Sequence, residues 1–563
     1  MTPKLVIVLI GVAVALVLWR GELPSGRMNR SFLLLLAACA ASLVLSTALS
    51  THPALSLNGG SWRRLGLVSQ IAILLFAMLA AIDCSSGRDR VNVYLNATML
   101  GAVPVALYAV LQYFGWDPWL PKQSYHAGDF SWSIIRPPST MGHASYLATY
   151  LVFVVFCCAH LAMQRVWRTA SIATAALCCV AIVLSGTRAA LLALVVGAVF
   201  AAVRMGVRVR PLQAIGLAAA FVLMSGAFYF SPAGQAIRNR VTWTSMEPFG
   251  GARPLLWRDS LRMSAHHLAL GYGPESFLTD FPRYQSADLE RAFPEFQHES
   301  PHNIFLDALL SSGIIGMVIL GGLCVWGFAA ARDRPLLGAA LAAGITAQLF
   351  TSFVLPTVFF FFLILALLAQ PDERRRVRSL RLAAVACALA LTFFAVRFTV
   401  ADQALASASA ALDRGDLASA DRAHRRYEEW TLPGAGSDLY YSRRLAEFAN
   451  KSTDFRKKAL ALQEGFTAAA GAARNSEQPA NAWYNMAAFL ALTNSATDVE
   501  HSLRNAIAVA PNWYKPHWVL AQLLEREQRL DEACREAETA AKLNPNEPRL
   551  NAAVEKLRAA QRQ

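Results

Sequence analysis

Long apolar segments, separated by short polar or basic stretches, dominate the chain up to about residue 400. A helix needs about 20 predominantly apolar residues to cross the hydrocarbon core of a bilayer. The segments therefore predict about twelve transmembrane helices, a few of them short enough to be tilted or re-entrant. The first is expected to be a span and not a signal peptide, because another span follows at once and no small-residue cleavage site precedes a soluble region. The predicted spans are residues 5–19, 32–49, 65–82, 91–114, 144–163, 169–184, 189–203, 212–230, 304–331, 336–353, 356–369 and 382–398.

The pattern changes after the last span. Residues 401–563 are rich in Ala, Glu, Arg and Leu at helical spacing, and the motif at 510–512 recurs at 544–546, with its prolines 34 residues apart. A helix-turn-helix period of about 34 residues that ends in Pro is typical of tetratricopeptide (TPR) repeats. We expect an α-solenoid tail, clearest over residues 480–546, with a concave surface that could bind a protein partner. The alternative is a helical spacer or docking platform without a ligand.

Composition supports a membrane protein. Hydrophobic residues make up 55% of the chain, charged residues 16%, and the mean hydropathy is +0.36, which is too apolar for an ordinary globular surface. The predicted fold is all-α: a polytopic membrane domain over residues 1–400, with a long loop at about 231–302, and a helical tail over residues 401–563. Most of the nine cysteines lie in or beside apolar segments, where Cys behaves as a small hydrophobe. No CxxC pair suggests a metal site.

The net charge of +14 would suggest nucleic-acid binding in a soluble protein. Here most of the excess lies in short loops between spans, where Lys and Arg set the orientation in the membrane, so no nucleic-acid partner is expected. The strongest basic loop, 374–381, is predicted to be cytoplasmic. Counting spans from it places basic loops at 20–30, 88–90, 165–168 and 204–210 on the same side. The loops at 50–64, 115–142 and 231–302, and the tail, are then outside.

A charge at the edge of the membrane is the first candidate for chemistry. Arg188 lies between two apolar segments, on the predicted outer side, with almost no loop around it. Charged groups are costly at such positions, which makes each a candidate functional residue. The alternative is a snorkelling arginine that caps a helix.

The long outer loop contains the second group of candidates. Arg253 and Arg258 flank Trp257, and the loop ends with the segment 298–303, His-Glu-Ser-Pro-His-Asn. Two His and a Glu could bind a metal, but their spacing matches no zinc pattern. A single His is more typical of a proton acceptor or a substrate hydrogen-bonding group.

Arginines and a histidine at the outer membrane edge indicate a particular chemistry. Arginine forks bind pyrophosphate bidentately and without a metal. No DxD-type metal clamp is evident, and the nearest candidate, residues 288–290, is expected to be a solvated helix face. The residues suggest displacement of a pyrophosphate-linked group by a hydroxyl.

Several blocks, in this order, resemble the O-antigen ligase/polymerase family of bacterial inner-membrane glycan transferases. The resemblance covers roughly residues 30–370. Where the family reads Gly-Asn-Pro-Asn, residues 142–145 read Gly-His-Ala-Ser. The blocks are 58–64, 136–143, 185–188, Arg253 with Trp257, 271–273 with Phe277, and 302–303 with Gly313 and Gly316.

The resemblance implies a transferase without metal or cofactor, with a GT-C-like membrane fold, that uses an undecaprenyl-pyrophosphate-linked glycan at the periplasmic face of the bacterial inner membrane. By matching position, Arg188 and Arg253 would hold the pyrophosphate. His302 would activate or orient the acceptor hydroxyl. Further candidates are Arg258, Arg136, His298 and Asn303.

The acceptor stays open at this point. It could be a lipid A core sugar, another lipid-linked repeat unit, or a protein hydroxyl, and the tail favours a protein slightly because such surfaces bind peptides. The alternative from another class is a membrane-anchored TPR scaffold or a transporter without catalysis. A transporter should show internal symmetry of its spans and broken helices at the midplane, and neither is evident in the sequence.

Overall fold

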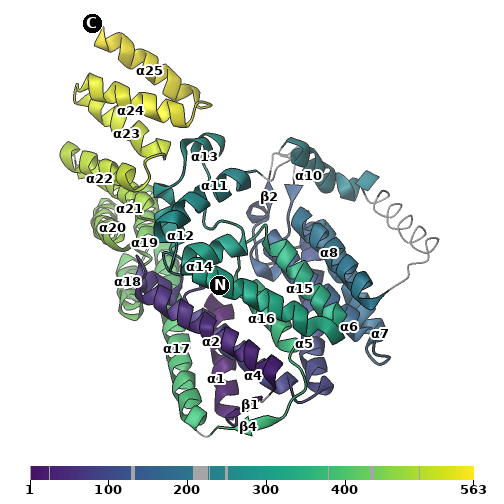
Figure 1. Cartoon of the computed structure of the whole chain (residues 1–563). Helices are drawn as coiled ribbons and strands as arrows, with labels where there is room; N and C mark the ends of the chain where they lie inside the picture. The colour runs from purple at the N-terminus through teal and green to yellow at the C-terminus, as the bar shows by residue number, and fades with distance from the viewer. Residues whose placement is uncertain are drawn as a thin grey trace.

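The computed structural model describes residues 2–24, 26–127, 134–206, 226, 229–246, 251–377, 379–431, 436–493 and 495–562. This part of the chain is predominantly helical, with only a few short strands (Figure 1), which confirms the predicted all-α class. Among the described residues, seven helices are long and apolar enough to cross a membrane, and α1, α7, α15 and α16 are shorter apolar helices. The apolar helices are α1 Thr2–Leu18, α2 Arg27–Ala48, α4 Leu67–Cys84, α5 Arg88–Tyr113, α6 Ala144–Leu161, α7 Arg168–Leu184, α8 Arg188–Met205, α14 Ile304–Ala330, α15 Pro335–Gln348, α16 Leu355–Leu367 and α17 Ser379–Asp413. The predicted span 212–230 lies almost entirely outside the described residues.

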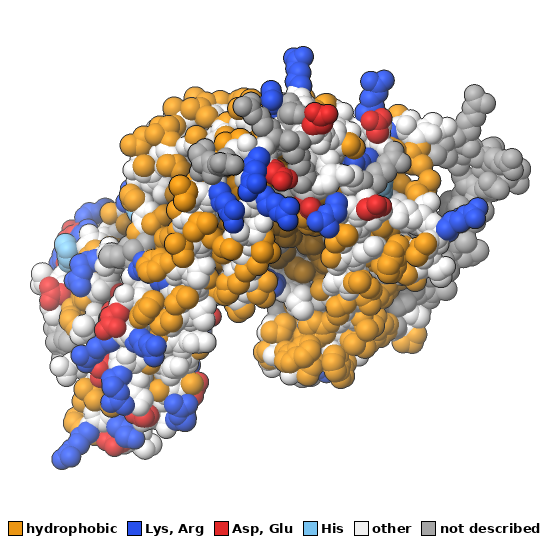
Figure 2. Space-filling model, turned by 90° about the horizontal axis from the view of Figure 1, so that it is seen from below, with side chains coloured by type: hydrophobic (Ala, Val, Ile, Leu, Met, Phe, Trp, Pro, Cys, Tyr) orange, Lys and Arg blue, Asp and Glu red, His pale blue; other side chains and the backbone are white. Residues whose placement is uncertain are grey.

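Helix α6 is the most buried span of the membrane domain, and it packs against α7, α8 and α15. Glycines allow the close approach. A Cβ at Gly344 would lie 2.1 Å from the ring of Phe153, and one at Gly197 would lie 2.3 Å from the ring of Phe156. Small residues at helix crossings are the usual way to gain contact area between spans. Figure 2 shows mostly hydrophobic side chains over the outside of this domain, as a lipid-facing surface requires.

Two basic loops meet at one end of the membrane domain. The strand β1, Glu22–Pro24, pairs antiparallel with β4, Arg374–Arg376. The amide of Asn29 donates to the backbone oxygen of Gln370 at 2.9 Å, and the Gln370 N–H donates back at 3.0 Å. Lys and Arg side chains gather on the face seen from below (Figure 2). The loops that the sequence assigns to one side of the membrane therefore lie side by side.

At the other end, the long loop folds into a helical cap. Its helices are α10 Gln235–Met246, α11 Arg253–Ser264, α12 Phe277–Asp280 and α13 Ala287–Ala292. Leu256, Met263, Phe281 and Leu289 form a small core with Leu310 of α14. The cap is thus seated on the membrane domain by apolar burial.

The cap also joins α14 through its backbone. Helix α14 is interrupted at Gly313, whose φ is +67° and ψ −167°. The hydrophobic pattern predicts one continuous span here and no break. The segment 268–273 fills the interruption: the N–H of Ile314 donates to Leu268 at 2.8 Å, and the N–H of Tyr272 donates to Leu310 at 2.7 Å. A Cβ at Gly313 would lie 2.1 Å from the carbonyl oxygen of Ala269. Only glycine fits both this backbone conformation and this contact.

Helix α17 continues without interruption from the membrane domain into the tail, past the predicted domain boundary at residue 400. In the tail, most helices pack against the helix that comes next in the chain (Figure 1). The arrangement is that of a helical solenoid, and the assignment to TPR repeats stays a prediction. The tail helices are α18 Leu417–Trp430, α19 Asp438–Lys451, α20 Phe455–Asn475, α21 Pro479–Leu490, α22 Ala496–Val509, α23 Tyr514–Arg526, α24 Leu530–Leu543 and α25 Pro548–Gln561.

The tail docks on the cap around α13. Asn512 donates to the backbone oxygen of Gln285 at 2.7 Å, and Lys515 pairs with Glu295 at 2.7 Å. Glu290 is only 2% exposed and accepts from the N–H of Tyr514 at 3.4 Å. The expectation that residues 288–290 form a solvated face is wrong for Glu290, because the tail covers that side of α13. Burial raises the pKa of Glu290 to about 8.

We predict that the docked tail loses stability as the pH rises. An exposed glutamate loses its proton near pH about 4.3, whereas Glu290 keeps its proton in the folded interface up to pH about 8. Between these values the folded state holds a proton that the unfolded state lacks, so its stability falls with increasing pH. The melting temperature should fall by several degrees from about pH 5 to about pH 9, and Glu290→Gln should flatten this slope. The exposed Glu555→Gln serves as the control, and an equally steep slope in Glu290→Gln would contradict the assignment.

Gly313→Ala should destabilise the protein by about 2–5 kcal/mol, because it adds both a steric clash and backbone strain. Gly321→Ala, in the same helix with open space at its Cβ position, should be neutral or slightly stabilising. The melting temperatures of the two purified variants give the comparison. Equal values would mean that the junction between the cap and α14 does not exist in solution.

Candidate functional site

A buried guanidinium joins the cap to the membrane domain. Arg63 follows the short helix α3, Pro53–Asn58, and is 5% exposed. Its Nε lies 2.8 Å from Glu275 of the cap, and its Nη1 lies 2.9 Å from Asp307 in the first turn of α14. Burial alone would lower the pKa of Arg63, but the two carboxylates more than offset this and raise it above its ordinary value. The guanidinium therefore stays charged and holds three segments together.

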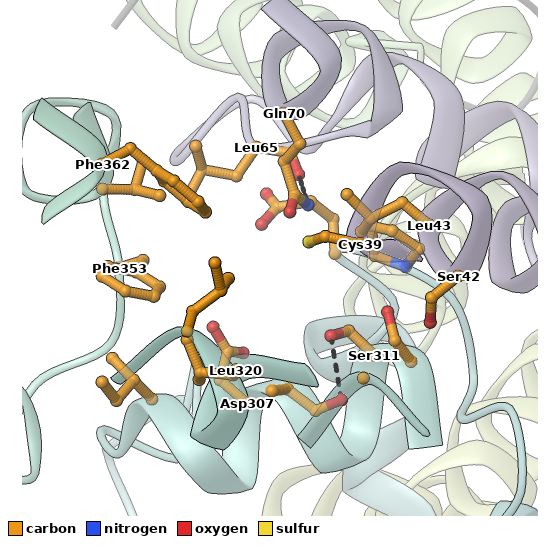
Figure 3. Close-up of a pocket in the computed structure, with 18 of the residues that line it drawn as sticks. Cys39, Ser42, Leu43, Leu65, Gln70, Asp307, Ser311, Leu320, Phe353 and Phe362 are labelled. Carbon is orange, nitrogen blue, oxygen red and sulfur yellow. Dashed lines mark hydrogen bonds between the residues drawn. The ribbon is translucent and has the colours of Figure 1, made fainter. Parts of the chain in front are cut away.

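A cavity opens below this ion pair, between α2, α4, α14 and α16 (Figure 3). Arg63, Glu275 and Asp307 line its polar end. Leu43, Leu65, Leu320, Phe353 and Phe362 line the remainder, together with a few small polar side chains. A cavity with one charged and one apolar end suits a molecule with a polar head and a hydrocarbon chain.

Three arginines from separate parts of the chain approach one another at the same end. Arg188 is the first residue of α8, Arg253 is the first residue of α11, and Arg136 follows strand β3, Ile134–Ile135, which pairs with β2, His126–Ala127. Burial, Arg253 and Arg188 together lower the pKa of Arg136. Burial and Arg188 lower the pKa of Arg253. We call Arg136, Arg188 and Arg253 the arginine cluster.

Two members of the arginine cluster lack a carboxylate partner among the described residues. Within the described part of the chain, neither Arg136 nor Arg188 forms an ion pair with a carboxylate. Arg136 donates to the hydroxyl of Ser145 at 3.2 Å, while its buried Nε has no hydrogen-bond partner among the described residues. Arg188 and Arg253 also lie in first helical turns, where the helix dipole adds positive potential. Such a site favours a ligand with more than one negative charge.

His302 lies beside the arginine cluster on a constrained backbone. Its φ is +52°, which is uncommon for a residue other than glycine. Trp257 donates to the carbonyl of the preceding Pro301 at 2.9 Å, and Asn303 caps α14 by accepting from Phe305 N–H at 3.0 Å. Both neighbours of His302 are therefore held in place.

The imidazole of His302 is neutral at ordinary pH. Burial, Arg253 and the adjacent histidines lower its pKa to about 3. Its Nδ1 lies 3.3 Å from the Ser300 hydroxyl. A neutral imidazole can accept a proton or a hydrogen bond from a hydroxyl group, which an imidazolium cannot do.

His143 is a site residue that the sequence did not single out. It caps the N-terminus of α6, where its Nδ1 accepts from the N–H of Ser145 at 3.2 Å. Part of the His143 side chain is exposed and the rest lies against the protein. This partial burial, together with the charges of Arg136 and Arg253, lowers the pKa of His143 to about 4. The departure at 142–145 thus preserves a capping side chain and adds a second neutral imidazole near the arginine cluster. His143 lies near the arginine cluster because distant segments of the chain meet there, and no local sequence motif encodes those contacts.

The remaining candidates differ in their surroundings. Arg258 pairs with Asp259 at 3.0 Å and Asp288 at 3.1 Å, which favours a structural role inside the cap. Asn303 uses its side-chain oxygen for helix capping and donates to the carbonyl of Leu349 at 3.2 Å. His298 is buried near His302, and burial lowers its pKa to about 4.

The tail reaches the edge of this site through Glu477, in the connection between α20 and α21. Its carboxylate accepts from the N–H of Ser61 at 3.0 Å and from the Ser61 hydroxyl. Its backbone oxygen accepts from Thr279 at 2.9 Å. Burial raises the pKa of Glu299, and the nearby Glu477 adds to this effect. The tail is thus part of the wall around Arg63.

One comparison matches part of the membrane domain and the cap to a known family. The family described as O-antigen ligase matches residues 173–321, a range that begins in α7 and ends in α14. The match includes Arg188, Arg253 and His302. A sequence comparison with curated proteins finds no match. The chain therefore carries an O-antigen ligase domain over residues 173–321, and this match agrees with the family that the sequence resemblance predicted.

Proposed function

We propose that this protein transfers a glycan from undecaprenyl pyrophosphate to an acceptor hydroxyl at the periplasmic face of a bacterial inner membrane. The observation that carries the proposal is the arginine cluster, which brings three guanidinium groups together beside a neutral imidazole. Two of its three members, and His302, fall within the O-antigen ligase domain. The domain supports glycan transfer in general, and the residues around it support this donor.

The arginine cluster would bind the pyrophosphate of the donor. Guanidinium forks match phosphate oxygens bidentately, and they supply positive charge without a metal ion. During transfer the acceptor oxygen bonds to the anomeric carbon, and the bond from that carbon to the pyrophosphate oxygen breaks. The leaving group keeps the electron pair, so its negative charge grows. Groups fixed in advance around that charge lower the barrier of the reaction.

His302 would receive the proton of the acceptor hydroxyl or hold that hydroxyl in line. With a pKa of about 3 it is a weak base in the free protein. The bound pyrophosphate would compensate the positive charge of Arg253, which is one of the causes of this low pKa. The donor would therefore raise the pKa of His302 toward the range where a histidine is an effective base.

The cavity beside Arg63 supports a lipid-linked donor. Its charged end is close enough for Arg63 to influence His302, and its apolar end extends between α14 and α16. The break in α14 is a feature that transporters share, but here the backbone of residues 268–273 fills it. The acceptor could be a lipid A core sugar, a second lipid-linked repeat unit or a protein hydroxyl. The contact of Glu477 with Ser61 supports an acceptor or partner held by the tail near the site.

Removal of any member of the arginine cluster should reduce transfer by about 10²–10³-fold. The assay uses membranes with matched amounts of each variant, a lipid-pyrophosphate-linked glycan donor and the three classes of acceptor. Arg188→Ala, Arg253→Ala and Arg136→Ala are compared with Arg262→Ala, an exposed arginine on the same helix as Arg253. His302→Ala should lose about 10²-fold or more.

A lysine variant separates the effect of the positive charge from that of the planar guanidinium group. Arg188→Lys keeps the charge but not the planar fork, so activity should be recovered only in part. Wild-type activity in all three arginine variants would refute the proposed site. Transfer by wild type with none of the acceptors would refute the proposed reaction.

The pH profiles should separate the free protein from the donor complex. The neutral form of His302 is required, so activity is present above its pKa and is lost as the pH falls through it. In kcat/KM, which reports the free protein, no loss is expected near the ordinary histidine pKa of about 6.5, because the pKa of His302 is about 3. In kcat, which reports the complex, the loss should begin at a higher pH. Coincident profiles would contradict the proposed effect of the donor.

A further inference from the structure

The tail contains a cluster of metal-ligand side chains away from the transferase site. His424 and Glu428 lie one turn apart on α18, and Asp438 is the first residue of α19. One ligand atom from each of the three lies within 4.8 Å of the others. Residues four apart share one face of a helix, so α18 presents His424 and Glu428 together toward the start of α19.

Several buried polar atoms in this cluster lack partners. His424 is 5% exposed and Tyr441 is 3% exposed. Within the described ranges, the Nε2 of His424, the Oδ1 of Asp438, the hydroxyl of Tyr441 and the Oε2 of Glu464 have no hydrogen-bond partner. Buried polar groups in proteins are almost always satisfied, because an unpaired one is costly. Two of these atoms, the Nε2 of His424 and the Oδ1 of Asp438, belong to the three-residue cluster, which points to a ligand that the cluster would share.

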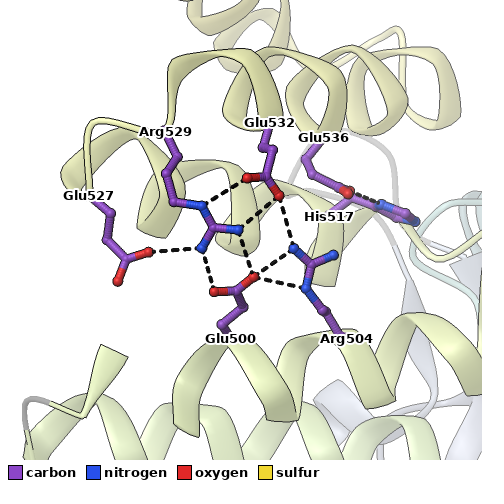
Figure 4. Close-up of polar contacts among 7 residues, drawn as sticks. All are labelled: Glu500, Arg504, His517, Glu527, Arg529, Glu532 and Glu536. Atoms are coloured by element: carbon purple, nitrogen blue, oxygen red, sulfur yellow. Dashed lines mark hydrogen bonds and ion pairs between the residues drawn. The ribbon is translucent and has the colours of Figure 1, made fainter. Parts of the chain in front are cut away.

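Two other charged clusters of the tail are well satisfied. His517, a second buried histidine, is bonded at both ring nitrogens, by Glu536 at 2.6 Å and by the carbonyl of Pro511 at 3.0 Å. Arg529 lies 2.6 Å from Glu500 and 2.8 Å from Glu532 (Figure 4). The incomplete bonding at His424 is therefore a local feature and not a general property of these helices.

The distance between two of the candidate ligands already suits zinc. The Nε2 of His424 lies 3.4 Å from the Oδ1 of Asp438. In a tetrahedral site with metal–ligand bonds of about 2.1 Å, two ligand atoms are roughly 3.4 Å apart. The imidazole is fixed by stacking on Tyr441, with ring centroids 3.9 Å apart and an interplanar angle of 10°. Glu428 is more exposed and can approach by a change of rotamer.

The charge around the cluster also favours a cation. Asp421, Glu428, Asp438 and Glu464 surround His424, and Arg425 is committed to an ion pair with Asp421. A divalent ion would compensate the negative charge that these carboxylates concentrate around one imidazole.

We propose that His424, Glu428 and Asp438 bind one zinc ion, with a water molecule as the fourth ligand. The ion links the end of α18 to the start of α19. This site is structural and independent of glycan transfer.

The test uses the full-length protein, purified in detergent through a tag without histidine and stripped with a chelator. Zinc binding is measured by competition with a chromophoric chelator, and the bound metal is counted after dialysis. Wild type should bind one zinc ion per chain and gain several degrees in melting temperature. His424→Ala and the nearly isosteric Asp438→Asn should each weaken binding by about 100-fold or more.

His501→Ala, an exposed histidine of the same tail, is the control and should bind zinc as wild type does. The wild-type titration needs no variant, so misfolding of a variant cannot hide the result. Absence of zinc binding by wild type at micromolar concentration would overturn the proposal. Equal affinity in wild type, His424→Ala and Asp438→Asn would overturn it too, because the ion would then be bound elsewhere.

Discussion

The ion pairs of Arg63 with Glu275 and Asp307 are the contact on which the rest of the site depends. They join the loop after α3, the cap and the first turn of α14, which lie far apart in the sequence. A buried charge that loses its partner costs about 3–5 kcal/mol, so the three groups must assemble together. The backbone junction at Gly313 reinforces the same arrangement. Once the cap is seated, Arg253 and His302 lie beside Arg136, Arg188 and His143.

Without a ligand, the positive charge of the site and its partial burial oppose each other. The arginine cluster concentrates positive charge in a partly buried place, and burial together with this charge lowers the pKa of Arg136, Arg253, His143 and His302. A pyrophosphate would relieve this repulsion and make His302 more basic. Donor binding and proton acceptance would then be coupled through charge alone. The tail, docked through Glu477 and Glu290, stands next to this site and can bring a partner to it.

Much of the fold could be predicted from the sequence, because a bilayer imposes a length and an apolar composition on every span. Arg188, Arg253 and His302 could be chosen because charged groups at a membrane edge are costly, and the structure brings them together. Other features depend on contacts between distant segments. Glu290 resembles an exposed helix residue until the tail covers it, and the break at Gly313 is visible only once residues 268–273 fill it. Arg63 and His143 belong to blocks that resemble the family, but the sequence alone indicated no specific role for either residue.

The most direct test of the account is the affinity of the purified protein for undecaprenyl pyrophosphate without an acceptor, measured by native mass spectrometry. Binding and chemistry are then separated. Wild type and His302→Ala should retain the lipid, while a variant with Arg136, Arg188 and Arg253 all replaced by Ala should lose at least about tenfold in affinity. Undecaprenyl monophosphate should bind more weakly, because it offers fewer oxygens to the guanidinium groups. Equal retention of the pyrophosphate by wild type and the triple variant would refute the arginine cluster as the pyrophosphate site.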